Sequence, residues 1–231
     1  MKFDVVLWDL DGTLLDFKIA QKEAITQVFR TIHKPLTDDI IDLYSQINES
    51  YWNKLRLGEV TEPELLTKRF QTLFEELNMP DVDVDSVVNE YENVLGNVYE
   101  YIHDSLDLCK ALQVRCKQYI ITNGIAGTQR KKIALSGLKD CVTDCFISEE
   151  IGYEKPSQEF LQYVFDRIPN FDPERTLIVG DSLSSDIKEG LAAGIKTCYF
   201  NPDGNQVTGD ILPDYEIDHL WDILRALDFV L

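Results

Sequence analysis

Two acids separated by one residue follow a short apolar run near the start of the chain. Residues 3–8 are nearly all apolar, and Asp9 and Asp11 come directly after them. In an extended backbone these two side chains project to the same side. A carboxylate at Asp9 could attack phosphorus and form an aspartyl-phosphate. Asp11 could protonate the leaving oxygen and then deprotonate the attacking water, so this pair suggests phosphoryl transfer.

Polar side chains also follow three later apolar runs. Thr122 and Asn123 end one run, Lys155 comes a few residues after the next, and Asp181 and Asp186 follow a third. In a parallel α/β sheet, ligands bind at the carboxyl ends of the strands. We therefore expect these side chains to face one crevice.

The carboxylates require a cation, because a phosphate ester and an ionised Asp9 repel each other. Mg²⁺ prefers oxygen ligands, which Asp9, Asp181 and the backbone carbonyl of Asp11 could supply. Asp186 would be an outer ligand or would support the others. We therefore expect a Mg²⁺ cofactor.

The transferring phosphoryl group would need donors of its own. Thr122 and Lys155 could hold its oxygens, with Asn123 beside them as a further substrate-binding residue. Gly12 permits a tight turn out of the strand, which would let backbone amides approach the phosphate. Asp9, Asp11 and Lys155 are accordingly the predicted catalytic residues.

Short apolar strands that alternate with helices must position these residues. Strand patterns occur at residues 3–8, 118–122, 144–148, 176–180 and 196–200, and helical patterns at 126–136, 157–168 and 184–193. Continuous apolar runs are typical of strands covered on both faces. Gly137 and Gly194 are placed as helix stops. The sequence predicts an α/β fold with a doubly wound parallel Rossmann-like sheet.

Residues 18–101 interrupt this alternation. Amphipathic stretches occur at 18–33, 37–54, 61–78 and 84–101, without a strand pattern. Thr61 and Glu64 have the spacing of a capping box. We expect an all-helical cap at 18–101, inserted into a core of residues 1–17 plus 102–231. Within the cap, Trp52 could stack a base and Arg69 could contact the substrate.

Composition excludes several classes of protein. The 231 residues carry a formal net charge of −19, and the longest basic cluster spans residues 130–132. A nucleic-acid binder needs a basic surface, and an anionic membrane would repel this chain. The 3 histidines form no ligand-like pair, and the 5 cysteines form no C-x-x-C pair, which disfavours zinc sites and disulfides.

The expected setting is cytoplasmic. Asp4 and Asp9 interrupt the first apolar run, so it does not have the pattern of a signal segment. No stretch approaches the roughly 20 apolar residues of a membrane span. The expected partner is a small phosphorylated molecule, bound by a monomer or homodimer.

Four motifs in this order resemble those of the haloacid dehalogenase superfamily. They are Asp9–Thr13, Thr122–Gly124, Lys155–Pro156 and Gly180–Asp186, and they span nearly the whole chain. The resemblance implies a Rossmann-like core, a helical cap after the first motif, and a Mg²⁺-dependent phosphomonoester hydrolase.

More narrowly, the chain is similar to the bacterial 5′-nucleotidases that act on pyrimidine and noncanonical nucleotides. The similarity includes segments 122–125, 151–156 and 180–183, and it extends to Asn48, Trp52, Gly58, Arg69 and Phe70 in the cap. It implies a 5′-nucleotidase that acts on nucleoside monophosphates.

Other functions remain open on the same fold. The protein could be a phosphatase for phosphoglycolate or a sugar phosphate, a sugar-phosphate mutase, or a non-catalytic binding protein. A dehalogenase is disfavoured, because carbon–halogen displacement needs neither a metal nor an acid at Asp11. A Gly-Asp-Ser-Leu esterase is also disfavoured, because Glu216 stands where its catalytic Asp would precede His219.

Overall fold

Two compact units divide the chain in the computed structural model, which describes residues 2–207 and 209–227. One unit runs up to Phe17 and resumes at Tyr99, and the other comprises Lys18–Val98. The first contains every strand of the described residues, and the second is all-helical.

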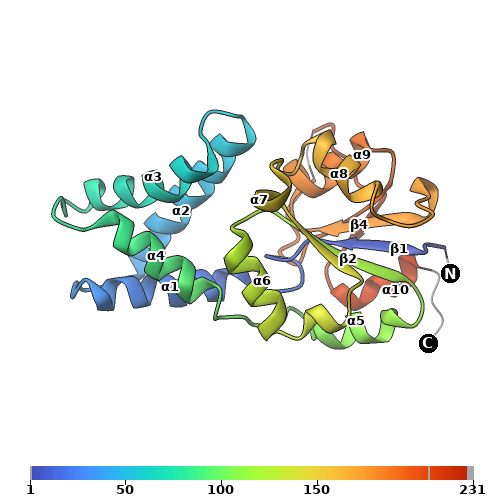
Figure 1. Ribbon diagram of the computed structural model, residues 1–231, viewed down its shortest axis with the longest axis horizontal. Helices are drawn as coiled ribbons and strands as arrows, with labels where there is room; N and C mark the ends of the chain where they lie inside the picture. The colour runs from blue at the N-terminus through green and yellow to red at the C-terminus, as the bar shows by residue number, and fades with distance from the viewer. Residues whose placement is uncertain (1, 208, 228–231) are drawn as a thin grey trace. The chain divides into compact units, whose positions relative to one another are not determined.

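A six-stranded, fully parallel sheet forms the centre of the first unit, in the order β3-β2-β1-β4-β5-β6 (Figure 1). Its strands are β1 (Val5–Trp8), β2 (Lys117–Thr122), β3 (Asp144–Ile147), β4 (Thr176–Gly180), β5 (Lys196–Phe200) and β6 (Tyr215–Ile217). The predicted doubly wound sheet is confirmed. The chain leaves β1 toward β2 and β3, then returns to β4 on the other side of β1. This reversal places the topological switch point at β1.

Helices cover both faces of the sheet. They are α5 (Ser105–Gln113), α6 (Ala126–Leu135), α7 (Ser148–Ile151), α8 (Gln158–Phe165), α9 (Lys188–Ala192) and α10 (Ile223–Ala226). Successive strand residues point to opposite faces. Val6 and Trp8 accordingly pack in one core with side chains of α5, α6 and α10, whereas Val5 and Leu7 pack in a second core with α8.

Short turns complete this unit. Three are 3₁₀ turns at Leu138–Asp140, Pro173–Arg175 and Leu220–Asp222, and a π-helical turn at Leu183–Ile187 leads into α9. The predicted helix over 184–193 is therefore this turn followed by α9. Gly137 and Gly194 have φ angles of 72° and 71° and end the preceding helices, as predicted.

Four helices form the second unit, with α1 beginning at the residue before it. They are α1 (Phe17–Thr31), α2 (Asp38–Arg56), α3 (Glu62–Glu76) and α4 (Val84–Leu95). The predicted capping box is present, because the backbone N–H of Thr61 donates to Glu64 Oε2 at 2.9 Å. The apolar faces meet in an aromatic core in which Tyr44 and Phe70 stack with ring centroids 5.2 Å apart.

The helical unit ends earlier than the sequence pattern indicates. α4 stops at Leu95, and residues 99–101 belong to the α/β unit. The backbone N–H of Asp16 donates to the carbonyl of Glu100 at 2.9 Å, and Leu15 forms an antiparallel bridge with Tyr101. These backbone bonds tie the two connecting segments together, and a pattern of apolar side chains does not reveal them.

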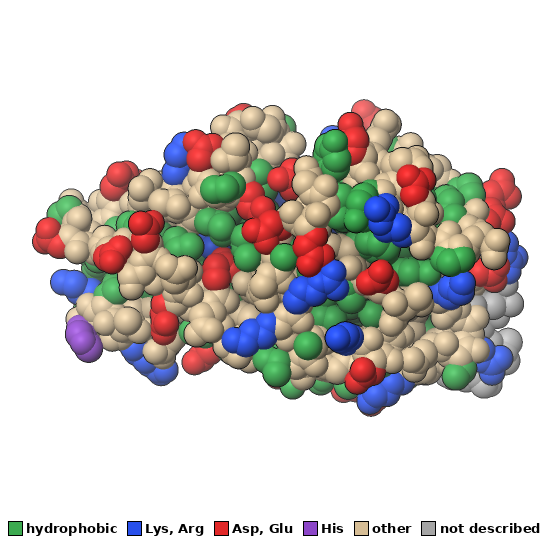
Figure 2. Space-filling view, in the orientation of Figure 1, with side chains coloured by type: hydrophobic (Ala, Val, Ile, Leu, Met, Phe, Trp, Pro, Cys, Tyr) green, Lys and Arg blue, Asp and Glu red, His purple; other side chains and the backbone are tan. Residues whose placement is uncertain are grey.

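The remaining expectations concern the cysteines, the surface and the membrane. All five cysteines are buried free thiols. Figure 2 shows acidic and basic side chains interspersed over the visible face. Within the described residues, no helix is long and apolar enough to cross a membrane.

Candidate active site

The residues predicted at the strand ends meet at the carboxyl edge of β1, β2 and β4. Asp9 follows β1, and its backbone N–H donates to the carbonyl of Val179 in β4 at 2.9 Å. Thr122 is the last residue of β2, and Asp181 directly follows β4. Parallel strands in register end at the same level, so β1 with its two neighbours delivers these groups to one place.

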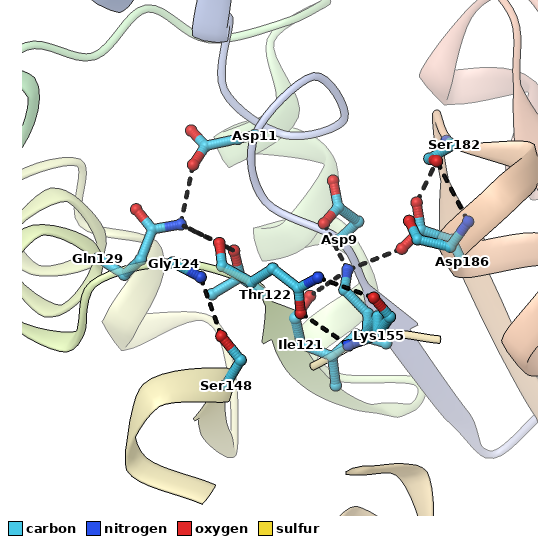
Figure 3. A network of polar contacts seen from close by, with 12 residues as sticks. Asp9, Asp11, Ile121, Thr122, Gly124, Gln129, Ser148, Lys155, Ser182 and Asp186 are labelled. Atoms are coloured by element: carbon cyan, nitrogen blue, oxygen red, sulfur yellow. Dashed lines mark hydrogen bonds and ion pairs between the residues drawn. The ribbon is translucent and has the colours of Figure 1, made fainter. Parts of the chain in front are cut away.

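Lys155 joins the acids from the loop between α7 and α8. Its Nζ donates to Asp9 Oδ1 at 2.7 Å, to Asp186 Oδ1 at 2.7 Å and to the carbonyl of Ile121 at 3.0 Å (Figure 3). An ammonium has three N–H donors, and all three are satisfied here. The side chain of Lys155 is 2% exposed and that of Asp186 is 1% exposed. The lysine therefore holds two carboxylates in fixed positions inside the protein.

Burial and charge oppose each other in this group. Burial by itself lowers the pKa of Lys155, but Asp186 and Asp9 outweigh it and raise the pKa, so the lysine is cationic. Burial raises the pKa of Asp9 to about 7, against the opposing charge of Lys155. Asp181 is the exposed member of the cluster, and its pKa is also raised, by partial loss of solvent and by the charges of Asp9 and Asp186. When all three carboxyl groups are ionised, the cluster has more negative charge than its one lysine neutralises.

This excess charge has the composition of a cation site. Asp9, Asp181 and Asp186 each offer a carboxylate oxygen, and these atoms all lie within 4.8 Å of one another. Asp9 Oδ2 is buried and has no hydrogen-bond partner among the described residues. A donor set of oxygens alone suits a hard divalent cation such as Mg²⁺. The residues present therefore fit the expected metal.

Two glycines make room for these acids. A Cβ atom on Gly12 would lie 2.2 Å from Asp181 Oδ2, and one on Gly180 would lie 2.2 Å from Asp186 Oδ2. Gly12 has a φ of 94°, which fits the predicted tight turn out of the strand, and its N–H donates to the carbonyl of Leu15 at 2.8 Å. The approach of backbone amides to the phosphate stays a prediction. The absence of a side chain at Gly12 leaves room for the Asp181 carboxylate.

Asn123 contacts the backbone of Lys155 with both ends of its amide. Its Oδ1 accepts from the Lys155 backbone N–H at 2.8 Å, and its Nδ2 donates to the Lys155 carbonyl at 3.0 Å. Gly124 continues this link, since its N–H donates to Ser148 Oγ at 3.0 Å. These bonds do not support the predicted substrate contact of Asn123. They attach the loop of Lys155 to the end of β2.

Asp11 lies apart from the three clustered acids. Its Oδ2 accepts from Gln129 Nε2 at 2.8 Å and its Oδ1 from Lys132 Nζ at 2.7 Å. Gln129 Nε2 also donates to Thr122 Oγ1 at 2.8 Å. Sequence reasoning missed both α6 residues, although a polar i, i+3 pair on the helix after a motif strand is a usable signal. The backbone carbonyl of Asp11 as a metal ligand stays a prediction.

The two cap residues differ in their surroundings. Arg69 is 2% exposed and donates to Asn48 Oδ1 at 3.0 Å and to Glu92 Oε1 at 2.6 Å. These contacts give Arg69 a structural role within the helical unit, and they do not support the predicted substrate contact. Trp52 lies half-buried on α2, and its stacking on a base stays a prediction.

Glu189 on α9 is a further buried acid close to Lys155 and Asp186. It is 2% exposed, and neither of its carboxylate oxygens has a hydrogen-bond partner among the described residues. Burial raises its pKa well above the ordinary value, with Lys155 opposing and Asp186 adding to the shift. A carboxyl whose pKa is raised on folding fits the protein in its protonated form. Its contribution to stability is present below the pKa of the unfolded chain and is lost as the pH rises through the folded pKa.

Replacing this carboxyl with an amide is therefore expected to stabilise the protein at neutral and alkaline pH. Glu189→Gln should raise the free energy of unfolding at pH 8 by about 1–3 kcal/mol, because an amide cannot ionise and each unit by which burial raises a carboxyl pKa is worth about 1.4 kcal/mol. The gain should vanish near pH 4, and urea unfolding at both pH values measures it. The exposed Glu174→Gln is the matched control and should show no such dependence on pH. A less stable Glu189→Gln at pH 8 would contradict the burial argument.

Comparison with known proteins agrees with this geometry. A family model described as haloacid dehalogenase-like hydrolase matches residues 3–194. The chain belongs to this hydrolase family. It is 37% identical over 227 residues to HAD-hydrolase YfnB of Bacillus subtilis, covering 98% of this chain and 96% of that protein. A crystal structure of YfnB described as bound to magnesium superposes with a TM-score of 0.94, covering 99% of this chain and 100% of that one.

Two further relatives in the hydrolase family have more specific names. Pyrimidine 5′-nucleotidase PynA of Streptococcus pneumoniae is 33% identical over 229 residues, covering 99% of this chain and 96% of that protein. Pyrimidine 5′-nucleotidase YjjG of Escherichia coli is 28% identical, with coverage of 98% and 99%. The predicted superfamily, and the resemblance to its nucleotidase branch, are confirmed.

Proposed function

We propose that this hydrolase is a Mg²⁺-dependent phosphomonoesterase that acts on nucleoside 5′-monophosphates through an aspartyl-phosphate at Asp9. The main support is the group in which Lys155 holds Asp9 and Asp186 while Asp9 Oδ2 has no partner among the described residues. That oxygen is buried and unpaired, so it is the carboxylate atom available to ligate a cation or to bond to phosphorus.

The reaction has two steps. In the first, an oxygen of Asp9 bonds to phosphorus, the ester P–O bond breaks, and Asp11 gives its proton to the leaving oxygen. In the second, water attacks the same phosphorus, the P–O bond to Asp9 breaks, and Asp11 takes the proton from the water. The products are an alcohol and inorganic phosphate, and both acids return to their starting states.

The three clustered carboxylates would hold the cation, together with the backbone carbonyl of Asp11. When bound, Mg²⁺ would offset the charge shared by the carboxylates and the phosphoryl group. Thr122 Oγ1 lies at the same edge of the sheet and is the proposed donor to a phosphoryl oxygen. Lys155 uses all three N–H groups on protein oxygens, so it reaches the phosphoryl group only by exchanging one of these bonds.

Gly12→Ala tests whether the space beside Asp181 matters. Its Cβ would displace the Asp181 carboxylate, so phosphate release at limiting Mg²⁺ should fall by at least about 10-fold, the effect of 1.4 kcal/mol. A Mg²⁺ titration of phosphate release measures this. Gly12 has a φ of +94°, which alone costs about 1 kcal/mol of stability in an alanine variant.

Gly137→Ala separates the two effects. Gly137 has a φ of +72°, and none of the residues that the structure describes lies within 4 Å of a Cβ atom there, so this variant has the backbone strain without the collision. It should lose stability but keep its response to Mg²⁺. An equal Mg²⁺ response in both variants would count against Asp181 as a ligand.

The names of PynA and YjjG support nucleotides as substrates, and the half-buried Trp52 is our candidate for contact with the base. A phosphatase for phosphoglycolate or a sugar phosphate, and a sugar-phosphate mutase, use the same chemistry at Asp9. They differ in the group that accepts the phosphoryl: water in a phosphatase, a second sugar hydroxyl in a mutase. The identity of the product therefore distinguishes these functions.

Phosphate release from a panel of esters tests the proposal. The panel contains pyrimidine and purine nucleoside 5′-monophosphates, phosphoglycolate and a hexose phosphate, each with Mg²⁺ and with excess EDTA. We expect release from nucleotides with Mg²⁺ and loss of at least about 100-fold with EDTA, since charge stabilisation of this kind is worth several kcal/mol. No release from any ester would refute phosphatase function. Isomerised hexose phosphate without free phosphate would indicate a mutase.

A further inference from the structure

We infer that Gln129 and Lys132 are positioning residues that hold the carboxyl group of Asp11 and connect it to Thr122. The inference rests on the proposed function, in which Asp11 exchanges the proton. It adds two side chains of α6 to the residues on which that proton transfer depends.

The contacts use both oxygens of the carboxyl group. Gln129 Nε2 donates to Asp11 Oδ2 at 2.8 Å, and Lys132 Nζ donates to Oδ1 at 2.7 Å. The two donors are three positions apart and therefore lie on one face of α6. In Figure 3 the side chain of Asp11 points toward Gln129. A carboxyl group held at both oxygens has lost most of its rotational freedom.

Burial distinguishes this lysine from its neighbours on α6. The side chain of Lys132 is 1% exposed, whereas that of Arg130 is 47% exposed and pairs with Glu150 at 2.6 Å on the outside. A buried ammonium needs a partner, because loss of its water is costly. Asp11 is such a partner and is itself 21% exposed. The pair therefore has a protein-facing end and an end open to solvent.

Gln129 extends the link to the phosphoryl-binding residue. The same Nε2 that donates to Asp11 donates to Thr122 Oγ1 at 2.8 Å, and an amide nitrogen has two hydrogens for these two bonds. The Gln129 side chain therefore contacts both Asp11, which moves the proton, and the Thr122 hydroxyl, which is proposed to hold phosphate. Each Asp11 oxygen accepts one of these bonds and retains a second lone pair.

Leaving groups of different basicity test this role. A nucleoside 5′-monophosphate expels an alkoxide that must be protonated, whereas 4-nitrophenyl phosphate expels a stable phenolate. The ratio of kcat/KM for these two esters reports the acid step alone, because kcat/KM does not include the later hydrolysis of the aspartyl-phosphate. The ratio also does not depend on how much of a preparation is correctly folded.

We expect Lys132→Met to lower kcat/KM for the nucleotide by at least about 10-fold, a part of the 10²–10⁴-fold that acid catalysis supplies. For 4-nitrophenyl phosphate the fall should be under about 3-fold, because its leaving group needs no proton. Gln129→Leu also releases Thr122, so it should lower kcat/KM for both esters, and by the larger factor for the nucleotide. Lys132→Arg retains the cation and should restore part of the nucleotide rate. Arg130→Gln removes an exposed pair from the same helix and should leave both rates unchanged.

Equal losses on both esters, or no loss on either, would overturn the positioning role while leaving the phosphatase function intact. A wild-type protein that hydrolyses neither ester with Mg²⁺ would refute the phosphatase function, and with it this role of Asp11. The comparison therefore separates the two failures.

Discussion

Asp9→Asn is expected to lower kcat by at least about 10³-fold, or roughly 4 kcal/mol of transition-state stabilisation. A carboxamide is a poor nucleophile, so no aspartyl-phosphate can form. The Asn oxygen can still accept a hydrogen bond from Lys155, which in the native protein donates to Asp9 Oδ1 at 2.7 Å. The loss should therefore arise from chemistry rather than from a displaced lysine. Phosphate release at saturating substrate and Mg²⁺ measures it.

Thermal unfolding of Asp9→Asn is a second test, because it measures how the buried carboxyl group affects stability. Burial raises the pKa of Asp9 to about 7, so its contribution to stability is present below the unfolded pKa and declines as the pH rises through about 7. Without divalent cations at pH 8, the amide variant should be at least as stable as wild type. Asp4→Asn has the same change in charge, in an exposed pair with Arg175, and should retain full activity. Undiminished turnover in Asp9→Asn would refute the nucleophile.

Lys155→Met is expected to damage both activity and stability. Nζ of Lys155 bonds to Asp9 and Asp186, and all three side chains are at least nine-tenths buried. Removal of one partner from a buried ion pair costs roughly 3–5 kcal/mol, because the remaining charges are left without compensation. We expect kcat/KM to fall by at least about 10²-fold, a loss of roughly 2.7 kcal/mol.

The dependence on pH identifies the cause of that destabilisation. The two carboxylates left in Lys155→Met can take up protons at low pH, so the loss of stability should be large at pH 8 and smaller at pH 5. Chemical denaturation at both values measures this difference. Lys139→Met removes an exposed lysine from the same unit and should match wild type in stability at pH 5 and at pH 8. A loss that is equal at pH 5 and pH 8 would mean that lost packing, not uncompensated charge, destabilises the variant.

The strand ends made much of the candidate site predictable. Asp9, Thr122 and Asp181 stand at or directly after apolar runs, and parallel strands must end at a common edge. For Lys155 the sequence predicted only its place in the order of the motifs, because a long loop could have placed its side chain elsewhere in the fold. Its bonds to Asp9 and Asp186 come from that loop, which Asn123 holds in place.

Residues on helices were harder to interpret. Lys132 belongs to a basic run at residues 130–132 that has the appearance of a solvated surface, yet its side chain is 1% exposed. Arg69 resembled a substrate-binding side chain, yet it pairs with Glu92, which is 23 residues away. Partners at such distances are set by how helices pack, and a local pattern contains no information about that packing.

Primary structure alone is sufficient for the parallel α/β sheet, the helical insertion, and the acids and lysine that follow the strands, because strand periodicity and chain order are local properties. It also supports the phosphoryl-transfer proposal through the types of these residues. Tertiary structure decided which groups meet: it placed Asp181 against Gly12, attached Asp11 to α6, and left Asp9 Oδ2 without a partner in the described part of the chain. These outcomes depend on the packing of segments more than 100 residues apart, as between Asp11 and Lys132, 121 residues apart. Contacts at that separation determine the charge and the open space of the site.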